Sequence, residues 1–164
     1  MIVALGCNLP GAYTSREALL EAALAALPEE GLDLVARSSW WTSAAWPDAS
    51  GPEYLNGVAI VRTGLSPSET LQALHRIEAR FGRERGEANA PRTLDLDLVA
   101  HGRTVQDGDL VVPHPRAHER LFVMGPLAEL ASGWIHPVSG EPAFRLATTA
   151  SVGLDARPGQ PARS

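Results

Sequence analysis

The segment 53–63, EYLNGVAIVRT, limits the fold of this chain more than any other part. Its apolar residues fall on both faces over much of its length, which is typical of a strand covered on both sides. We therefore expect this strand at the centre of a sheet.

The N-terminal part of the chain predicts a strand, a helix and a second strand. The apolar run IVALGC at 2–7 fits a buried strand. Thr14 and Glu17 have the spacing of a capping box, and apolar residues then recur at helical period until Pro28 closes the segment. Residues 32–42, LDLVARSSWWT, are expected to form the next strand.

A second helix is signalled by three residues at once. Ser66 is placed as its N-cap, Pro67 as its first residue and Glu69 as the third residue of a capping box. Gly82 lies where a C-terminal cap belongs. The expected buried stripe consists of Leu71, Leu74, Ile77 and Phe81.

The remaining elements follow a charged loop at 82–92. We expect a strand over 93–100, a small hairpin that includes VQDGDLVV, and a helix over about 119–131. Residues 1–150 are expected to form a single domain, and the segment 151–164 is expected to be a disordered tail.

Up to residue 100 the predicted order is strand, helix, strand, strand, helix, strand. This βαββαβ order predicts an α+β fold of the ferredoxin-like kind, an antiparallel sheet with helices on one face. The hairpin and helix after residue 100 would be a C-terminal extension.

Composition excludes several kinds of site. All 14 basic residues of the 164 are Arg, so no site can depend on a P-loop, Schiff-base or kinase lysine. Cys7 is the single cysteine, which excludes an intrachain disulfide. The net charge of -5 argues against nucleic acid as a partner, and no apolar run approaches the length of a membrane span. We expect a cytoplasmic protein without membrane partners.

The string Arg92-Thr93-Leu94-Asp95-Leu96-Asp97-Leu98 is the sharpest chemical signal. In a strand Asp95 and Asp97 share one face while the leucines point into the core. The carboxylates then lie roughly 6–7 Å apart at the backbone, a spacing that suits Mg²⁺ with substrate phosphates. The alternative is a solvated strand face paired with arginines. Arg83, Arg85 and Arg92 crowd the preceding loop and favour a nucleotide–phosphate site.

Two further pairs could serve a site or be structural. His75 and Glu78 lie at i, i+3 on one exposed stripe of the second helix, where a solvated face is the alternative. Tyr54 and Asn56 share a face of the central strand, and Asn56 could bind a heterocycle edge or a neighbouring loop. Three indoles that could form core, rim or one ligand wall are Trp40, Trp41 and Trp46.

Five motifs together resemble the 6-hydroxymethyl-7,8-dihydropterin pyrophosphokinase family, over about residues 3–137. They are ALGCNL, GPEYLNGVAIVRT, LHRIEARFGRER, APRTLDLDL and VVPHPRAHERLFVMGPLAEL. The resemblance implies transfer of a pyrophosphoryl group from ATP to the pterin hydroxymethyl oxygen, with release of AMP, in folate biosynthesis. It also implies a monomer whose partners are ATP and the pterin, with two Mg²⁺ ions held at Asp95 and Asp97.

The resemblance further assigns residues to each substrate. Arg83, Arg85 and Arg92 correspond to positions that act on the ATP phosphates. The other positions implied for ATP are His75, Glu78, Leu98, His114 and Arg120. Those implied for the pterin are Ser43, Ala44, Trp46, Tyr54, Asn56 and Phe122.

The chain also departs from the family pattern. It has Ser43-Ala44-Ala45 where many members have Thr-Pro-Pro, Ala88-Asn89-Ala90 where they have Arg-Trp-Gly, and Val111 in place of Ser or Thr. These departures leave Asp95 and Asp97, which we call the acidic pair, unchanged. They keep open a second hypothesis, a catalytically impaired paralogue that binds nucleotide or pterin. A third hypothesis, an RNA-binding domain, is disfavoured by the acidic charge.

Overall fold

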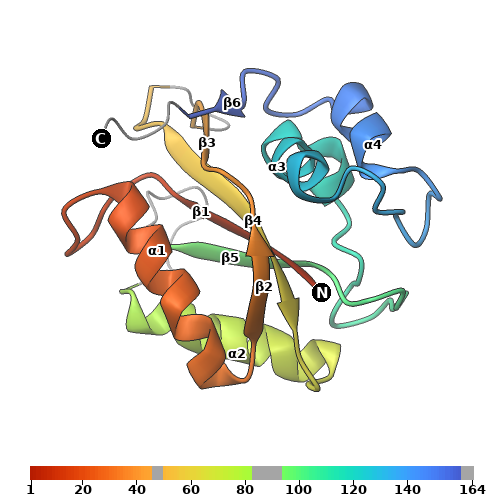
Figure 1. The fold of residues 1–164 in the computed structure, drawn as a ribbon, viewed down its shortest axis with the longest axis horizontal. Coiled ribbons are helices and arrows are strands. Elements are labelled where there is room, and N and C mark those ends of the chain that lie inside the picture. The colour runs from red at the N-terminus through yellow and green to blue at the C-terminus, as the bar shows by residue number, and fades with distance from the viewer. Residues whose placement is uncertain (46–49, 83–93, 160–164) are drawn as a thin grey trace.

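The computed structural model describes residues 1–45, 50–82 and 94–159. Its centre is an antiparallel sheet with the strand order β5-β1-β4-β3-β6, in which β2 also pairs with β4 (Figure 1). The strands are β1 (Ile2–Cys7), β2 (Asp33–Arg37), β3 (Trp41–Ser43), β4 (Tyr54–Arg62), β5 (Asp95–Ala100) and β6 (Arg157–Pro158). The predicted central place of β4 is confirmed, as is the α+β class with an antiparallel sheet.

Helices cover both faces of this sheet. They are α1 (Arg16–Ala26), α2 (Pro67–Arg80), α3 (Leu121–Ala131) and α4 (Ala143–Thr149), with short 3₁₀ turns at Leu27–Glu30 and Ala117–Glu119. One core joins α1 and α2 to the leucine face of β5. A second core joins α3 and α4 to the other face, and Figure 1 shows these two helix pairs apart on the two sides.

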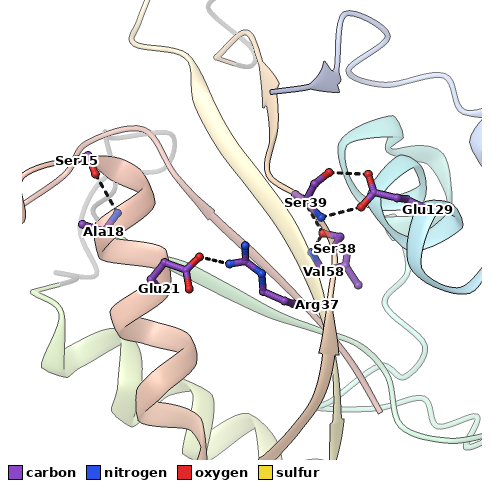
Figure 2. A network of polar contacts seen from close by, with 8 residues as sticks. All are labelled: Ser15, Ala18, Glu21, Arg37, Ser38, Ser39, Val58 and Glu129. Carbon is purple, nitrogen blue, oxygen red and sulfur yellow. Dashed lines mark hydrogen bonds and ion pairs between the residues drawn. The ribbon is translucent and has the colours of Figure 1, made fainter. Parts of the chain in front are cut away.

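The capping signals in the sequence located the start of α2 correctly and the start of α1 to within one residue. Ser66 and Glu69 form the predicted capping box at α2. At α1 the predicted cap is wrong by one residue, because Ser15 rather than Thr14 accepts the backbone N–H of Ala18, at 3.0 Å (Figure 2). In the α2 stripe, Leu74 and Ile77 are buried, whereas Leu71 and Phe81 are partly buried.

The strand predicted over 32–42 is divided into β2 and β3 by a bend at Ser38 and Ser39. The Ser38 hydroxyl accepts the Val58 N–H at 2.9 Å and donates to the Ser39 carbonyl at 2.8 Å. Glu129 of α3 accepts the N–H and the hydroxyl of Ser39 at 2.7 and 2.6 Å (Figure 2). A tertiary contact with α3 therefore holds the bend, and β3 leaves it toward the N-terminal end of α3.

The C-terminal part of the chain differs from the prediction, which gave no helix after about residue 131 and a disordered tail from residue 151. Residues 143–149 form α4, and the segment 151–159 packs along α3 and β3 through backbone hydrogen bonds and β6. The predicted hairpin reduces to one antiparallel bridge between Gln106 and Val112. In the part of the chain that the structure describes, no helix has the length and apolar character of a membrane span.

We expect Glu129→Gln to lower the free energy of unfolding by about 1 kcal/mol, because it replaces one carboxylate oxygen of the Ser39 clamp with an amide donor. Burial raises the pKa of Glu129, but hydrogen bonds from Ser39 and Trp41 outweigh burial and hold it below the usual 4.5. The stabilisation is therefore present above pH 4.5 and lost as the pH falls through the lower folded pKa.

Urea unfolding of the wild type and of Glu129→Gln between pH 7 and pH 3 measures the difference in their free energies of unfolding. The control is Glu141→Gln, which removes an exposed i, i+4 ion pair with Arg145 and should cost little at any pH. A Glu129→Gln penalty that is the same at pH 3 and pH 7 would contradict the clamp.

Candidate active site

A cavity of about 320 Å³ opens over the sheet face that α3 covers only in part. Its floor comes from β1, β4 and β5, and its walls come from the end of β3 and the start of α3. The predicted site residues that the structure brings together here are Ser43, Ala44, Tyr54, Asn56, Asp95, Asp97, Arg120 and Phe122.

The acidic pair lies at one end of the cavity floor. In β5, Asp95 and Asp97 are partly buried and alternate with fully buried Leu96, as predicted. Antiparallel pairing places Asp95 opposite Gly6 and Asp97 opposite Ala4 of β1. Because Gly6 and Ala4 are small, no bulky side chain stands beside the two carboxylates on this face of β1, and both carboxylates face the cavity.

A buried amide lies on the same floor, one strand further along the sheet. Asn56 of β4 is 6% exposed, pairs with Gly6 and donates from Nδ2 to the Ser43 hydroxyl at 2.9 Å. A Cβ at Gly6 would lie only 3.2 Å from Asn56 Oδ1, so glycine leaves room for this amide. Of the two roles that the sequence left open, Asn56 has the structural one, a hydrogen bond to Ser43 of the neighbouring strand, and it also lines the cavity. Tyr54, two residues earlier on the same face of β4, lines the cavity as well.

The start of α3 forms the facing wall. Arg120 and Phe122 both line the cavity, and the Arg120 guanidinium lies 5.9 Å from the centre of the Phe122 ring. Arg116 and Val123 line it as well. The lining of the cavity therefore combines two aspartates, two arginines and two aromatic residues.

The prediction that Glu78 lies on an exposed helix stripe is wrong. Glu78 of α2 is 2% exposed, and its Oε2 accepts the backbone N–H of Leu96 at 3.1 Å. β5 is the edge strand of the sheet, and an edge strand leaves N–H groups without strand partners. The Glu78 carboxylate accepts one of these N–H groups, that of Leu96, which lies between Asp95 and Asp97. It therefore holds the backbone that carries the two aspartates.

His114 is held as a neutral ring near the acidic pair. Its Nδ1 accepts the N–H groups of Arg116 and Ala117, both at 3.1 Å, which places the proton of the neutral ring on Nε2. Burial lowers the pKa of His114 to about 4, with Arg120 adding to the effect and Asp95 opposing it. The ring therefore offers a hydrogen-bond donor, and it is uncharged at neutral pH.

Four predicted ATP residues in the described part of the chain do not line the cavity: Glu78 and His114, described above, and His75 and Leu98. The Leu98 side chain is buried in the core under α1 and α2, and His75 lies partly buried on α2. Of the three indoles, Trp40 packs against Gly57 and Trp41 against Gly125 of α3. The predicted residues that lie outside the described part of the chain are Trp46, Arg83, Arg85 and Arg92.

Sequence reasoning missed five lining residues: Ala4, Leu5, Gly6, Arg116 and Val123. Ala4 and Gly6 are small residues of the strand predicted at 2–7, and their alternation with Val3 and Leu5 was the available signal. Arg116 belongs to the PHPR string, but no role was predicted for it. Val123 gives no chemical signal.

The acidic pair suits Mg²⁺ more than a metal held entirely by protein. Within residues 1–45, 50–82 and 94–159, no group of three or more His, Cys, Asp and Glu could hold a metal ion. Mg²⁺ commonly takes one or two carboxylates and fills its other positions with water and substrate phosphates. Asp95 and Asp97, on one face of one strand beside an open cavity, fit that donor set.

Fold and cavity together define a small-molecule-binding α+β domain with an acidic pair and two arginines at its pocket. Residues 2–132 match the family described as 7,8-dihydro-6-hydroxymethylpterin-pyrophosphokinase (HPPK). The chain belongs to this family.

Curated relatives and a solved structure agree with this match. The chain is 42% identical to a 2-amino-4-hydroxy-6-hydroxymethyldihydropteridine pyrophosphokinase of Synechocystis sp., over 88% of this chain and 73% of the relative. It is 39% identical to the enzyme of the same name from Haemophilus influenzae, over 84% of each chain. The fold is similar to Plasmodium falciparum HPPK-DHPS, with a TM-score of 0.66, 12% identity, and coverage of 90% of this chain and 42% of that chain.

We expect the stability of the protein to fall between pH 6.5 and pH 4 because His114 is held neutral. The unfolded chain takes up a proton at this residue near pH 6.5, whereas the folded protein does so only near pH 4. Since the ring is only partly buried, the expected loss is about 2 kcal/mol.

The matched variant is His114→Asn, whose Oδ1 can accept the same two backbone N–H groups without titrating. Urea unfolding at pH 7.5 and pH 4.5 should show a larger loss in the wild type than in the variant. Equal losses in the two proteins would show that His114 titrates normally.

Proposed function

We propose that this protein transfers a pyrophosphoryl group from ATP to the hydroxymethyl group of 6-hydroxymethyl-7,8-dihydropterin, releasing AMP, in folate biosynthesis. The observation that carries the proposal is one cavity that joins the acidic pair to a buried amide and aromatic side chains, in a chain of this family. The strand order β5-β1-β4-β2, with α1 and α2 packed on one face, supports the ferredoxin-like classification that we propose for residues 1–100.

The pterin is proposed to occupy the end of the cavity near β3 and β4. A fused heterocycle needs flat apolar contact and a few polar groups at its edge. Tyr54 and Phe122 offer aromatic surface, and Asn56 offers an amide whose orientation the Ser43 hydroxyl fixes. Ala44 contributes lining at this end, and Trp46 is proposed to join it.

The ATP phosphates are proposed to lie at the end near β5. The hydroxymethyl oxygen of the pterin attacks the β-phosphorus, the bond from that phosphorus to the α–β bridging oxygen breaks, and the bridging oxygen leaves with AMP. The proton of the hydroxyl group passes to solvent. His114 does not act as the base, because its Nδ1 already accepts two backbone N–H groups.

Such a reaction places negative charge on the phosphate oxygens in the transition state, and catalysis depends mainly on stabilising that charge. Asp95 and Asp97 would hold Mg²⁺, which supplies neutralisation of that charge when bound. Arg120 and Arg116 line the same cavity and are proposed to contribute positive charge there. Arg83, Arg85 and Arg92 are proposed to add further contacts with the phosphates, and His75 is proposed to contact the nucleotide. The sequence also suggested Glu78 and Leu98 for the nucleotide, but their side chains are buried on the other face of β5.

Release of AMP tests the proposal directly. We expect the protein, mixed with ATP, Mg²⁺ and 6-hydroxymethyl-7,8-dihydropterin, to form AMP in amounts equal to the pterin consumed, and to form none when the pterin is omitted. Folded protein that binds ATP or pterin without forming AMP would instead identify a binding module.

Asp97→Ala tests the acidic pair. We expect turnover to fall at least about 100-fold with little change in melting temperature, because the change removes half of the charge that holds the cation. The matched control is Asp107→Ala, on an exposed loop residue, which should retain wild-type turnover. Turnover of Asp97→Ala within about tenfold of the wild type would show that the pair does not hold a required metal.

A further inference from the structure

Residues 151–159 form a segment that runs from the start of α3 to β3, and we call this segment the C-terminal strap. It lies beyond residue 132, where the match to the family ends. Its first residues bond to the start of α3: the N–H groups of Ser151 and Val152 donate to the Glu119 carbonyl, both at 2.9 Å. The Val152 carbonyl accepts the Leu121 N–H, also at 2.9 Å.

These bonds bracket Arg120, the residue before α3. The N-cap residue Arg120 makes no side-chain capping hydrogen bond, and the Val152 carbonyl takes one of the N–H groups that a helix start leaves without a partner. The strap is thus built into the wall that carries Arg120 and Phe122.

Gly153 sets the place of the Phe122 ring. The residue has a left-handed backbone with φ of +68°, and a Cβ built on it would overlap the ring. Only glycine combines this conformation with such a close approach. The strap backbone therefore backs the aromatic ring that lines the cavity.

The second half of the strap binds the opposite wall. The Asp155 carboxylate accepts the backbone N–H of Ala44 at 2.6 Å, directly after β3. β6 then pairs with β3, and the Gly159 N–H donates to the Trp40 carbonyl at 2.7 Å. The strap therefore bonds to β3 and to the residues on both sides of it.

We propose that the C-terminal strap sets the width of the pterin end of the cavity, with Asp155 and Gly153 as positioning residues. The strap joins two walls that belong to separate elements, the end of β3 and the start of α3. Ser43 and Ala44 come from one wall, and Phe122 from the other. This inference rests on the proposed function, because it concerns the selection of the pterin.

Asp155→Ala and Asp155→Asn test one half of the proposal in the full-length protein. Loss of a charge-assisted hydrogen bond releases the Ala44 wall, so Asp155→Ala should raise KM for the pterin about tenfold. KM for ATP, and kcat at saturating pterin, should stay within about twofold. Asp155→Asn keeps an acceptor oxygen and should raise KM for the pterin only about two- to threefold.

Gly153→Ala and Gly140→Ala test the other half as a matched pair. Both glycines have left-handed backbones, with φ of +68° and +72°, but a Cβ at Gly140 meets no atom within 4 Å. Both variants should lose similar stability from backbone strain. Gly153→Ala alone should raise KM for the pterin, because its Cβ displaces the Phe122 ring.

The outcomes separate this inference from the proposed function. A wild-type protein that forms no AMP overturns the proposed function and the inference with it. A wild-type protein that turns over, with an unchanged pterin KM in Asp155→Ala and Gly153→Ala, overturns the inference alone. Equal rises in KM for ATP and for the pterin would also overturn it, because they indicate general loosening of the fold.

Discussion

The pairing of β1 with its two neighbours decides what lies in the cavity. Side chains alternate across a strand, so a fixed register places whole sets of residues on one face. Asp95, Gly6 and Asn56 stand opposite one another on three adjacent strands. A slip of one residue in β5 would send both carboxylates into the leucine core and remove the acidic pair from the cavity.

The buried carboxylate of Glu78 helps to hold β5 in this register, although β5 is an edge strand with a neighbouring strand on one side only. It accepts the Leu96 N–H between the two aspartates, where a further strand would otherwise supply a carbonyl. On the other side of the cavity, Glu129 and the C-terminal strap hold β3 through Ser39 and Ala44. The floor depends on strand pairing, whereas the walls depend on side chains from distant parts of the chain.

This division explains how much the sequence predicted. Alternation in β5 and β4 depends only on neighbouring residues, and it correctly placed Asp95 with Asp97 and Tyr54 with Asn56 on shared faces. Local capping signals likewise located α2. The bend at Ser38, the burial of Glu78 and the packing of residues 151–159 arise from partners 18 to 111 residues away, which local patterns do not reveal.

The most direct measurement of the central claim is a crystal structure with Mg²⁺, a non-hydrolysable ATP analogue and the pterin. The account predicts the pterin against Asn56 and Phe122, and the phosphates of the analogue beside Asp95 and Asp97, with the hydroxymethyl oxygen facing the β-phosphorus. Ligands bound away from this cavity, or phosphates at the Asn56 end with the acidic pair uninvolved, would contradict it.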